Sequence, residues 1–268
     1  MPRQPDGPPP APVVQRLRVH YAKRDRLRFT SHRDFQRALE RALRRAGVPV
    51  AVSAGFTPHP KISYAGAAPT GVASEAEYVE IGLQVRMPPA EVGTRLDSAL
   101  PPGLDVVEVV EAAAPGSLAD RLQASHWRIT LGCPPEEVGR AVAAFLAEAT
   151  VTVERITRDG RRPIDARGAV VSASVARGTG ASTGGEPDSE HHCATIDLVV
   201  RHTIPAVRPD DVLAALRQAA GLVPPEPPYV IRLAQGLLRE DGRIADPLAP
   251  DREAVTADTA PAPTPPDM

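Results

Sequence analysis

Aromatic residues, cysteines and lysines are all scarce in this chain of 268 residues. It has one Trp, four Tyr and four Phe, and so few rings disfavour an RRM-type platform that stacks on unpaired bases. Two cysteines, Cys133 and Cys193, are too few for a disulfide framework, and we expect two free thiols. Lysine occurs twice against 29 arginines, so Lys23 and Lys61 stand out from the basic background.

Long apolar runs and the signature motifs of common enzymes are also missing. No run of 18 apolar residues exists, and the proline-rich start lacks the apolar segment of a signal peptide. We therefore expect a cytoplasmic protein with no membrane contact. The HHC run at 191–193 has no accompanying C-x-x-C or H-E-x-x-H spacing, and no Walker A or G-x-S-x-G motif occurs. We accordingly expect no metal site and no cofactor.

Positive charge is concentrated near the start of the chain. Between residues 14 and 64 there are 12 Lys or Arg against 3 Asp or Glu, a net charge of +9. The whole chain has 31 basic and 33 acidic residues, so the remainder has 19 basic and 30 acidic residues and a net charge of −11. A basic cluster on a nearly neutral protein favours a polyanionic partner, and RNA is the leading candidate.

Shifts in composition mark the edges of the folded parts. Proline-rich or Gly/Ser/Thr-rich stretches without hydrophobic periodicity are typical of disordered ends and flexible insertions. We predict a disordered start (1–13), a basic domain (14–112), a linker (113–125), a second domain (126–238) with a flexible insertion (177–192), and a disordered tail (239–268).

Hydrophobic periodicity predicts the same order of elements, β-α-β-β-α-β, in both domains. This order is the signature of the ferredoxin-like split βαβ unit, so the predicted fold is α+β, with two tandem ferredoxin-like domains and disordered termini. In the first domain we expect strands near 17–21, 48–52, 77–85 and 104–110 and helices at 32–46 and 88–100; in the second, strands near 126–131, 151–157, 169–175, 194–202 and 229–233 and helices at 135–149 and 209–220.

The segment 32–46 predicts an amphipathic helix with an arginine face. Ser31 is placed to cap its start and Gly47 to end it. Its apolar residues recur at i, i+3, i+4 and i+7 and therefore pack inward. The opposite face carries Arg33, Arg37, Arg41 and Arg44, with Arg45 beside them and Glu40 as the one acidic residue within the stripe. Like charges at i, i+4 spacing weaken a helix, which favours a phosphate-facing surface over a merely solvated charged face.

The loop AGFTPHPKISYAG, residues 54–66, is a second candidate site. Two prolines bracket His59 and stiffen the backbone that carries Thr57, His59 and Lys61. These side chains could hold a phosphate or supply a general base, and the alternative is a Pro-ordered loop with an exposed His. His32, in the first turn of the predicted helix, could also act as a base or simply pack beside the cap.

A helix N-terminus flanked by Lys and Arg favours anions, so we expect His32, His59 and Lys61 to line one cleft. The candidate phosphate- or RNA-binding residues are Lys23, Ser31, His32, Arg33, Arg37, Arg41, Arg44, Arg45, Thr57, His59 and Lys61.

Several rare sequence elements occur here in one order. They are LRFTSHRD from Leu27, with Lys23 before it, RALRRAGVPV from Arg41, and SAGFTPHPKISYA from Ser53, followed by PTGVASEAEY. Together they resemble the bacterial radical-SAM-linked proteins, closely over residues 15–111 and more loosely to about 235. That resemblance implies a radical SAM enzyme as partner, because the family occurs fused behind one or as a separate chain. This chain lacks C-x-x-x-C-x-x-C and should not itself be a radical SAM enzyme.

A weaker likeness, by architecture alone, is to CRISPR RNA-processing endoribonucleases with two ferredoxin-like domains, and fold analogy does not transfer chemistry. The segment AQGLLREDG matches their Gly-rich loop poorly. We expect an RNA-binding recognition protein for tRNA or rRNA modification, associated with a radical SAM enzyme. Two alternatives stay open: a metal-independent endoribonuclease that uses His32 or His59, and a protein-only adaptor for the radical SAM enzyme.

Overall fold

The computed structural model describes residues 11–54, 56–157, 160–178 and 193–259. It divides into two compact units, which we describe separately. Unit 1 comprises Met1–Thr70, Ala76–Arg121 and Asp246–Met268, and unit 2 comprises Gly71–Glu75 and Leu122–Ala245. The predicted insertion 177–192 and the first ten residues lie almost wholly outside the described residues. None of the helices described is long and apolar enough to span a membrane.

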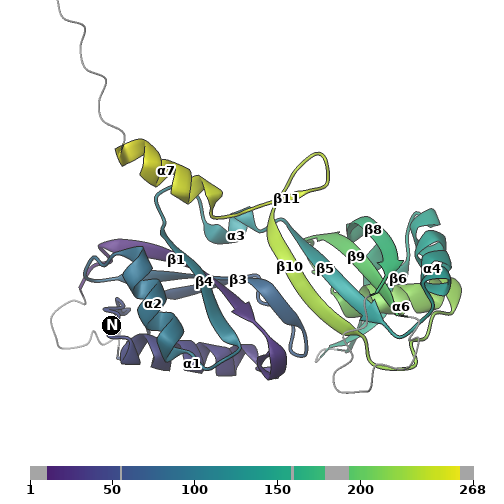
Figure 1. The fold of residues 1–268 in the computed structure, drawn as a ribbon, viewed down its shortest axis with the longest axis horizontal. Helices are drawn as coiled ribbons and strands as arrows, with labels where there is room; N and C mark the ends of the chain where they lie inside the picture. Colours follow the sequence, from purple (N-terminus) through teal and green to yellow (C-terminus); the bar gives the residue numbers. More distant parts are fainter. Residues whose placement is uncertain (1–10, 55, 158–159, 179–192, 260–268) are drawn as a thin grey trace, which may run out of the picture. The chain divides into compact units, whose positions relative to one another are not determined.

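Unit 1 is a sheet with two helices against one face (Figure 1). Its strands run in the order β4-β1-β3-β2, with β1 antiparallel to β4 and β2 antiparallel to β3. The elements are β1 (Gln15–Lys23), a 3-10 turn (Asp25–Phe29), α1 (His32–Arg45), β2 (Ile62–Ala65), β3 (Ala73–Leu83), α2 (Pro89–Ala99), β4 (Leu104–Glu111), α3 (Leu118–Arg121) and α7 (Ala249–Thr259).

The core of unit 1 lies between α1, α2 and the sheet. Leu17, Val19 and Tyr21 alternate along β1 and meet Phe35, Leu39 and Leu43 of α1, all of them buried. Each such side chain contributes about 1.5–3 kcal/mol when fully buried. The predicted strand at 48–52 is reduced to isolated bridges at Val50 and Val52, and the regular edge strand is β2, ten residues further on.

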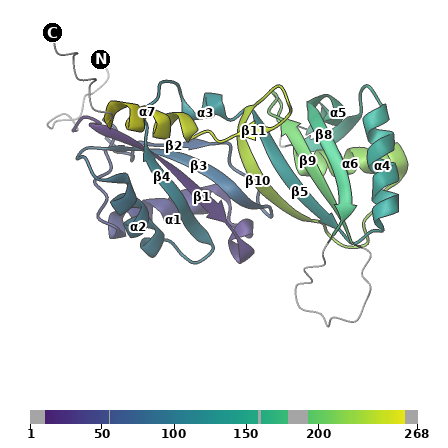
Figure 2. The ribbon, with the colours of Figure 1, turned by 45° about the horizontal axis from the view of Figure 1, so that its top comes forward.

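The opposite face of this sheet is covered by α3 and α7 (Figure 2). Asp251 of α7 is fully buried and bridges two buried arginines, Arg18 of β1 at 2.8 Å and Arg121 of α3 at 2.7 Å. Its other oxygen, Oδ1, also accepts the backbone N–H of Ala114 at 3.0 Å. The prediction of disorder over 239–268 is therefore wrong for α7, because buried ion pairs rather than apolar periodicity hold this helix. Residues 260–268 lie outside the described part.

Unit 2 contains an antiparallel sheet in the order β10-β5-β9-β8. Its helices α4 and α6 pack against each other beside β8 and β9 (Figure 2). The elements are β5 (Ala124–Leu131), α4 (Pro135–Ala147), β6 (Thr152–Thr157), β7 (Gly160–Asp165), α5 (Ala166–Ala169), β8 (Val170–Arg177), β9 (Ala194–Arg201), α6 (Pro209–Ala220), β10 (Tyr229–Leu238) and β11 (Ile244–Ala245).

Two pairings in unit 2 differ from the predicted pattern. The strand expected at 151–157 does not join the main sheet, because β6 pairs with β7, a strand that sequence reasoning missed, in a separate hairpin. Residues 73 and 74 pair in parallel with Ile231 and Arg232 of β10.

Cys133 and Cys193 are both buried free thiols. With helices and largely antiparallel strands in both units, the protein is an α+β protein.

Candidate nucleic-acid interface

Helix α1 displays its arginines because its other face is locked into the core. Ser31 caps the helix, since its Oγ accepts the backbone N–H of Asp34 at 3.2 Å. The helix ends at Ala46, and Gly47 follows with φ of 64°, a conformation that glycine adopts without strain. The residues turned to solvent include all of its arginines: Arg33, Arg37, Arg41, Arg44 and Arg45.

These arginines differ in having little compensating charge from most of the other described arginines of unit 1, Arg26 and Arg28 excepted. Their one carboxylate contact among the described residues is Arg37 with Asp34, at 3.9 Å. Arg44 and Arg45 donate to backbone carbonyls, of Glu40 and Ala99, which leaves their charges unneutralised. By contrast, a carboxylate lies within 3.2 Å of each of Arg16, Arg18, Arg24, Arg86, Arg95, Arg121 and Arg252.

The start of α1 is partly occupied by its own acidic residue. The hydroxyl of Ser31 donates to Oδ2 of Asp34 at 2.7 Å, so this carboxylate lies at the positive end of the helix. His32 is exposed, and its Nε2 is 3.0 Å from Nε2 of Gln36. An added phosphate at this helix end would meet the charge of Asp34, so the arginine face is the better place for one.

Tyr64 of β2 is a residue that sequence reasoning missed. Its ring meets His32 edge-on, with centroids 5.1 Å apart, and also lies against Phe35. Its hydroxyl is buried and has no hydrogen-bond partner among the described residues. Burial, with a smaller effect from the charge of Glu40, raises the pKa of Tyr64. The Tyr64 ring therefore packs against His32 at the edge of the sheet. The Tyr64 hydroxyl stays neutral.

The loop before β2 is closed by backbone hydrogen bonds. Ser53 N–H donates to the carbonyl of His59 at 2.8 Å, and His59 N–H donates to Oγ of Ser53 at 3.0 Å. Lys61 is tied to Ala51 and to Gly82 of β3 through its N–H and C=O. The side chains of Thr57, His59 and Lys61 are exposed on this support.

Lys23 differs from the expectation for a surface phosphate ligand. It is only 5% exposed, and its Nζ lies 3.3 Å from the carbonyl of Pro69 and 3.5 Å from that of Ala68. The reason is its position as the last residue of the central strand β1, opposite Leu104 of β4. Lys23 is therefore buried, whereas the arginines of α1 are exposed.

The contacts of the two candidate histidines within the described part of the chain do not join them. His32 meets Gln36 and Tyr64, whereas the backbone of His59 meets Ser53. Lys61 precedes Tyr64 by three residues, about 10 Å along an extended strand. A cleft shared by His32, His59 and Lys61 stays a prediction. Within the described residues, no group of three or more His, Cys, Asp or Glu could hold a metal ion.

Comparison with known proteins identifies the family. No curated protein matches the chain in sequence. A family model described as an uncharacterized protein conserved in bacteria, DUF2344, matches residues 16–209. The match includes the whole of α1 and the loop before β2 and covers well over half of the chain. The chain therefore belongs to the DUF2344 family of bacterial proteins.

Proposed function

We propose that the exposed face of α1 binds the phosphate backbone of RNA. The observation that carries this proposal is the contrast within unit 1. Seven of the nine other described arginines of unit 1 lie within 3.2 Å of a carboxylate, while among the described residues the five on α1 share a single contact, at 3.9 Å. A row of uncompensated guanidinium groups costs helix stability, and phosphates of a nucleic acid would supply the missing negative charge.

The architecture proposed with this function is a pair of ferredoxin-like domains. The strand order β4-β1-β3-β2 in unit 1 and the order β10-β5-β9-β8 in unit 2 support it, because each places the first and third strands of a split βαβ unit at the centre. The resemblance to radical-SAM-linked proteins supports a radical SAM enzyme as partner. In this proposal the protein recognises a tRNA or rRNA that the partner modifies.

The test is RNA binding by a variant that removes charge without touching the core. The substitutions Arg33→Gln, Arg37→Gln and Arg41→Gln are chosen because these side chains are exposed and make no hydrogen bond to the backbone in the described residues. Affinity for unfractionated tRNA would be measured over a range of salt concentrations. We expect weaker binding and a log–log salt slope that is smaller by about 2–3, since each of three lost phosphate contacts removes about 0.7–0.9.

The matched control removes the same charge from unit 2, through Arg140→Gln, Arg162→Gln and Arg217→Gln, which are also exposed. An unchanged affinity and salt slope for the α1 variant, or an equal loss in the control, would contradict the proposal.

Two further outcomes of the same RNA experiments point to the two alternative functions. Cleavage of the RNA in EDTA that is lost in His32→Ala or His59→Ala favours the endoribonuclease. Absence of any salt-dependent RNA binding favours the protein-only adaptor.

A further inference from the structure

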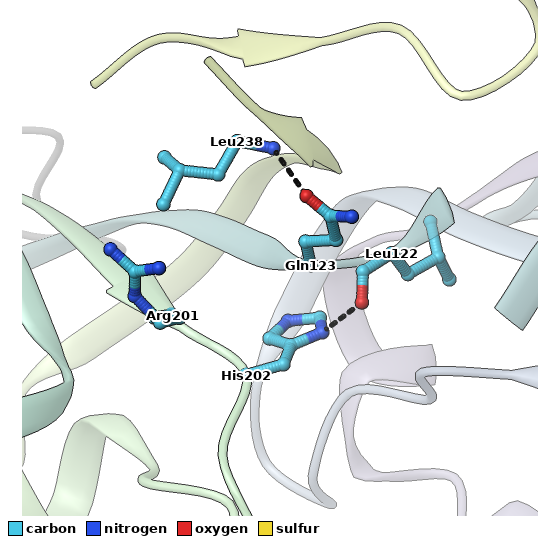
Figure 3. Close-up of a pocket in the computed structure, with 5 residues that line it drawn as sticks. All are labelled: Leu122, Gln123, Arg201, His202 and Leu238. Carbon is cyan, nitrogen blue, oxygen red and sulfur yellow. Dashed lines mark hydrogen bonds between the residues drawn. The ribbon is translucent and has the colours of Figure 1, made fainter. Parts of the chain in front are cut away.

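Unit 2 contains a cavity that is open to solvent and is not part of the proposed RNA surface (Figure 3). It has a volume of about 430 Å³ and is lined by Leu122, Gln123, Arg201, His202 and Leu238. A bare anion such as phosphate would fill little of it, and the volume lies in the range of small-molecule sites.

The ring of His202 forms one wall, and its protonation state follows from its partners. The carbonyl of Leu122 is 2.7 Å from Nδ1, so Nδ1 carries the proton that it donates. Nε2 then accepts the hydroxyl of Ser125 at 2.8 Å. Burial lowers the pKa of His202, assisted by the charge of Arg232, so the imidazole is neutral at pH 7. With both nitrogens engaged in hydrogen bonds, the ring has only its flat face left for a ligand.

The polar part of the lining can recognise an anion. Arg201 is the last residue of β9; its guanidinium is exposed and has no ion-pair partner in the described part of the chain. Gln123 accepts the backbone N–H of Leu238 through its Oε1, at 3.4 Å, which leaves its Nε2 group to donate. None of the described residues that line the cavity is acidic. A guanidinium fork and an amide donor that line one pocket suit the oxygens of a phosphate.

We propose that this cavity binds a nucleoside monophosphate. Arg201 and the amide of Gln123 take the phosphate, while the base lies on the face of His202 between the side chains of Leu122 and Leu238. Two sources supply this chemistry, a free nucleotide and the phosphorylated end of an RNA strand. The site does not rest on the RNA proposal, because all of its residues belong to unit 2 and none lies on α1.

The test is calorimetric titration of the full chain with AMP, GMP, CMP and UMP, and with adenosine, inorganic phosphate and benzoate. We expect at least one nucleotide to bind, with adenosine and inorganic phosphate each weaker by about tenfold or more, because each provides only half of the contacts. Arg201→Gln should weaken the nucleotide by about tenfold or more. Arg162→Gln, an exposed arginine of β7, is the matched control and should bind as the parent protein does.

A competition experiment separates the two sources. If a 5′-phosphorylated oligoribonucleotide displaces the bound nucleotide and its unphosphorylated form does not, the cavity takes an RNA end; if neither does, it takes a free nucleotide. Both results support the proposal. The proposal is overturned if no nucleotide binds up to about 1 mM, if benzoate binds as well as the best nucleotide, or if Arg201→Gln binds as tightly as the control. Loss of RNA binding in the α1 variant would leave each of these results unchanged.

Discussion

Asp251→Asn tests whether a buried carboxylate holds the C-terminal helix on unit 1. The substitution keeps the shape of the side chain but removes the charge that lies 2.8 Å from Arg18 and 2.7 Å from Arg121. The side chains of these arginines are only 3% and 8% exposed, so neither can regain full hydration without moving. Breaking a buried ion pair from one side costs about 3–5 kcal/mol. That is a large share of the 5–15 kcal/mol that stabilises a typical protein.

Hydrogen exchange followed by mass spectrometry is the suitable assay, because it reports each unit separately and needs no two-state assumption. We expect the amides of α7 and β1 to lose protection by about 3 kcal/mol or more. The loss of protection in β1 would be smaller only if α7 detaches first and lets both arginines reach water. In that case the amides of α7 alone lose their protection.

The control is Asp241→Asn, whose partner Arg243 is 3.8 Å away in an exposed pair. It should change protection by no more than about 1 kcal/mol. If Asp251→Asn left the exchange of both α7 and β1 within about 0.5 kcal/mol of the parent protein, as expected for a surface substitution, the buried pairs would not be what holds the helix.

Two further predictions concern titratable side chains. The pKa of His202 is lowered from 6.5 in the folded protein, so the stability of unit 2 should be complete above about pH 6.5 and fall as the pH drops through the folded pKa. His202→Gln should remove this dependence, as followed by the fluorescence of Trp127 in unit 2; an unchanged profile would show that other groups cause it. Tyr64→Phe removes a buried hydroxyl without a described partner and should leave stability equal or raise it by up to about 1 kcal/mol. A loss of more than 1 kcal/mol on urea unfolding would mean that the hydroxyl is bonded in solution.

Much of the candidate RNA surface could be predicted from sequence because it depends on local signals. The Ser31 cap, the apolar spacing and Gly47 predicted a helix at 32–46, and the structure has one at His32–Arg45 with its arginines exposed. Helix geometry alone decides which side chains share a face. The cavity of unit 2 carries no such signal. It needs Gln123, Arg201 and Leu238 together, and only the pairing of β5 with β9 and β10 brings these distant residues side by side.

The sequence by itself determined the elements that a local hydrophobic pattern marks: α1, α2, α4, α6 and most strands. The tertiary structure decided what depends on distant partners. Asp251 looks like one more acidic residue in a tail of Pro, Ala and Thr, yet in α7 it is buried against Arg18, 233 residues away. Lys23 looks like a surface cation, yet its place at the end of a central strand buries it. A local pattern records the preference of a segment, but burial and ion pairing depend on which segments fold against it.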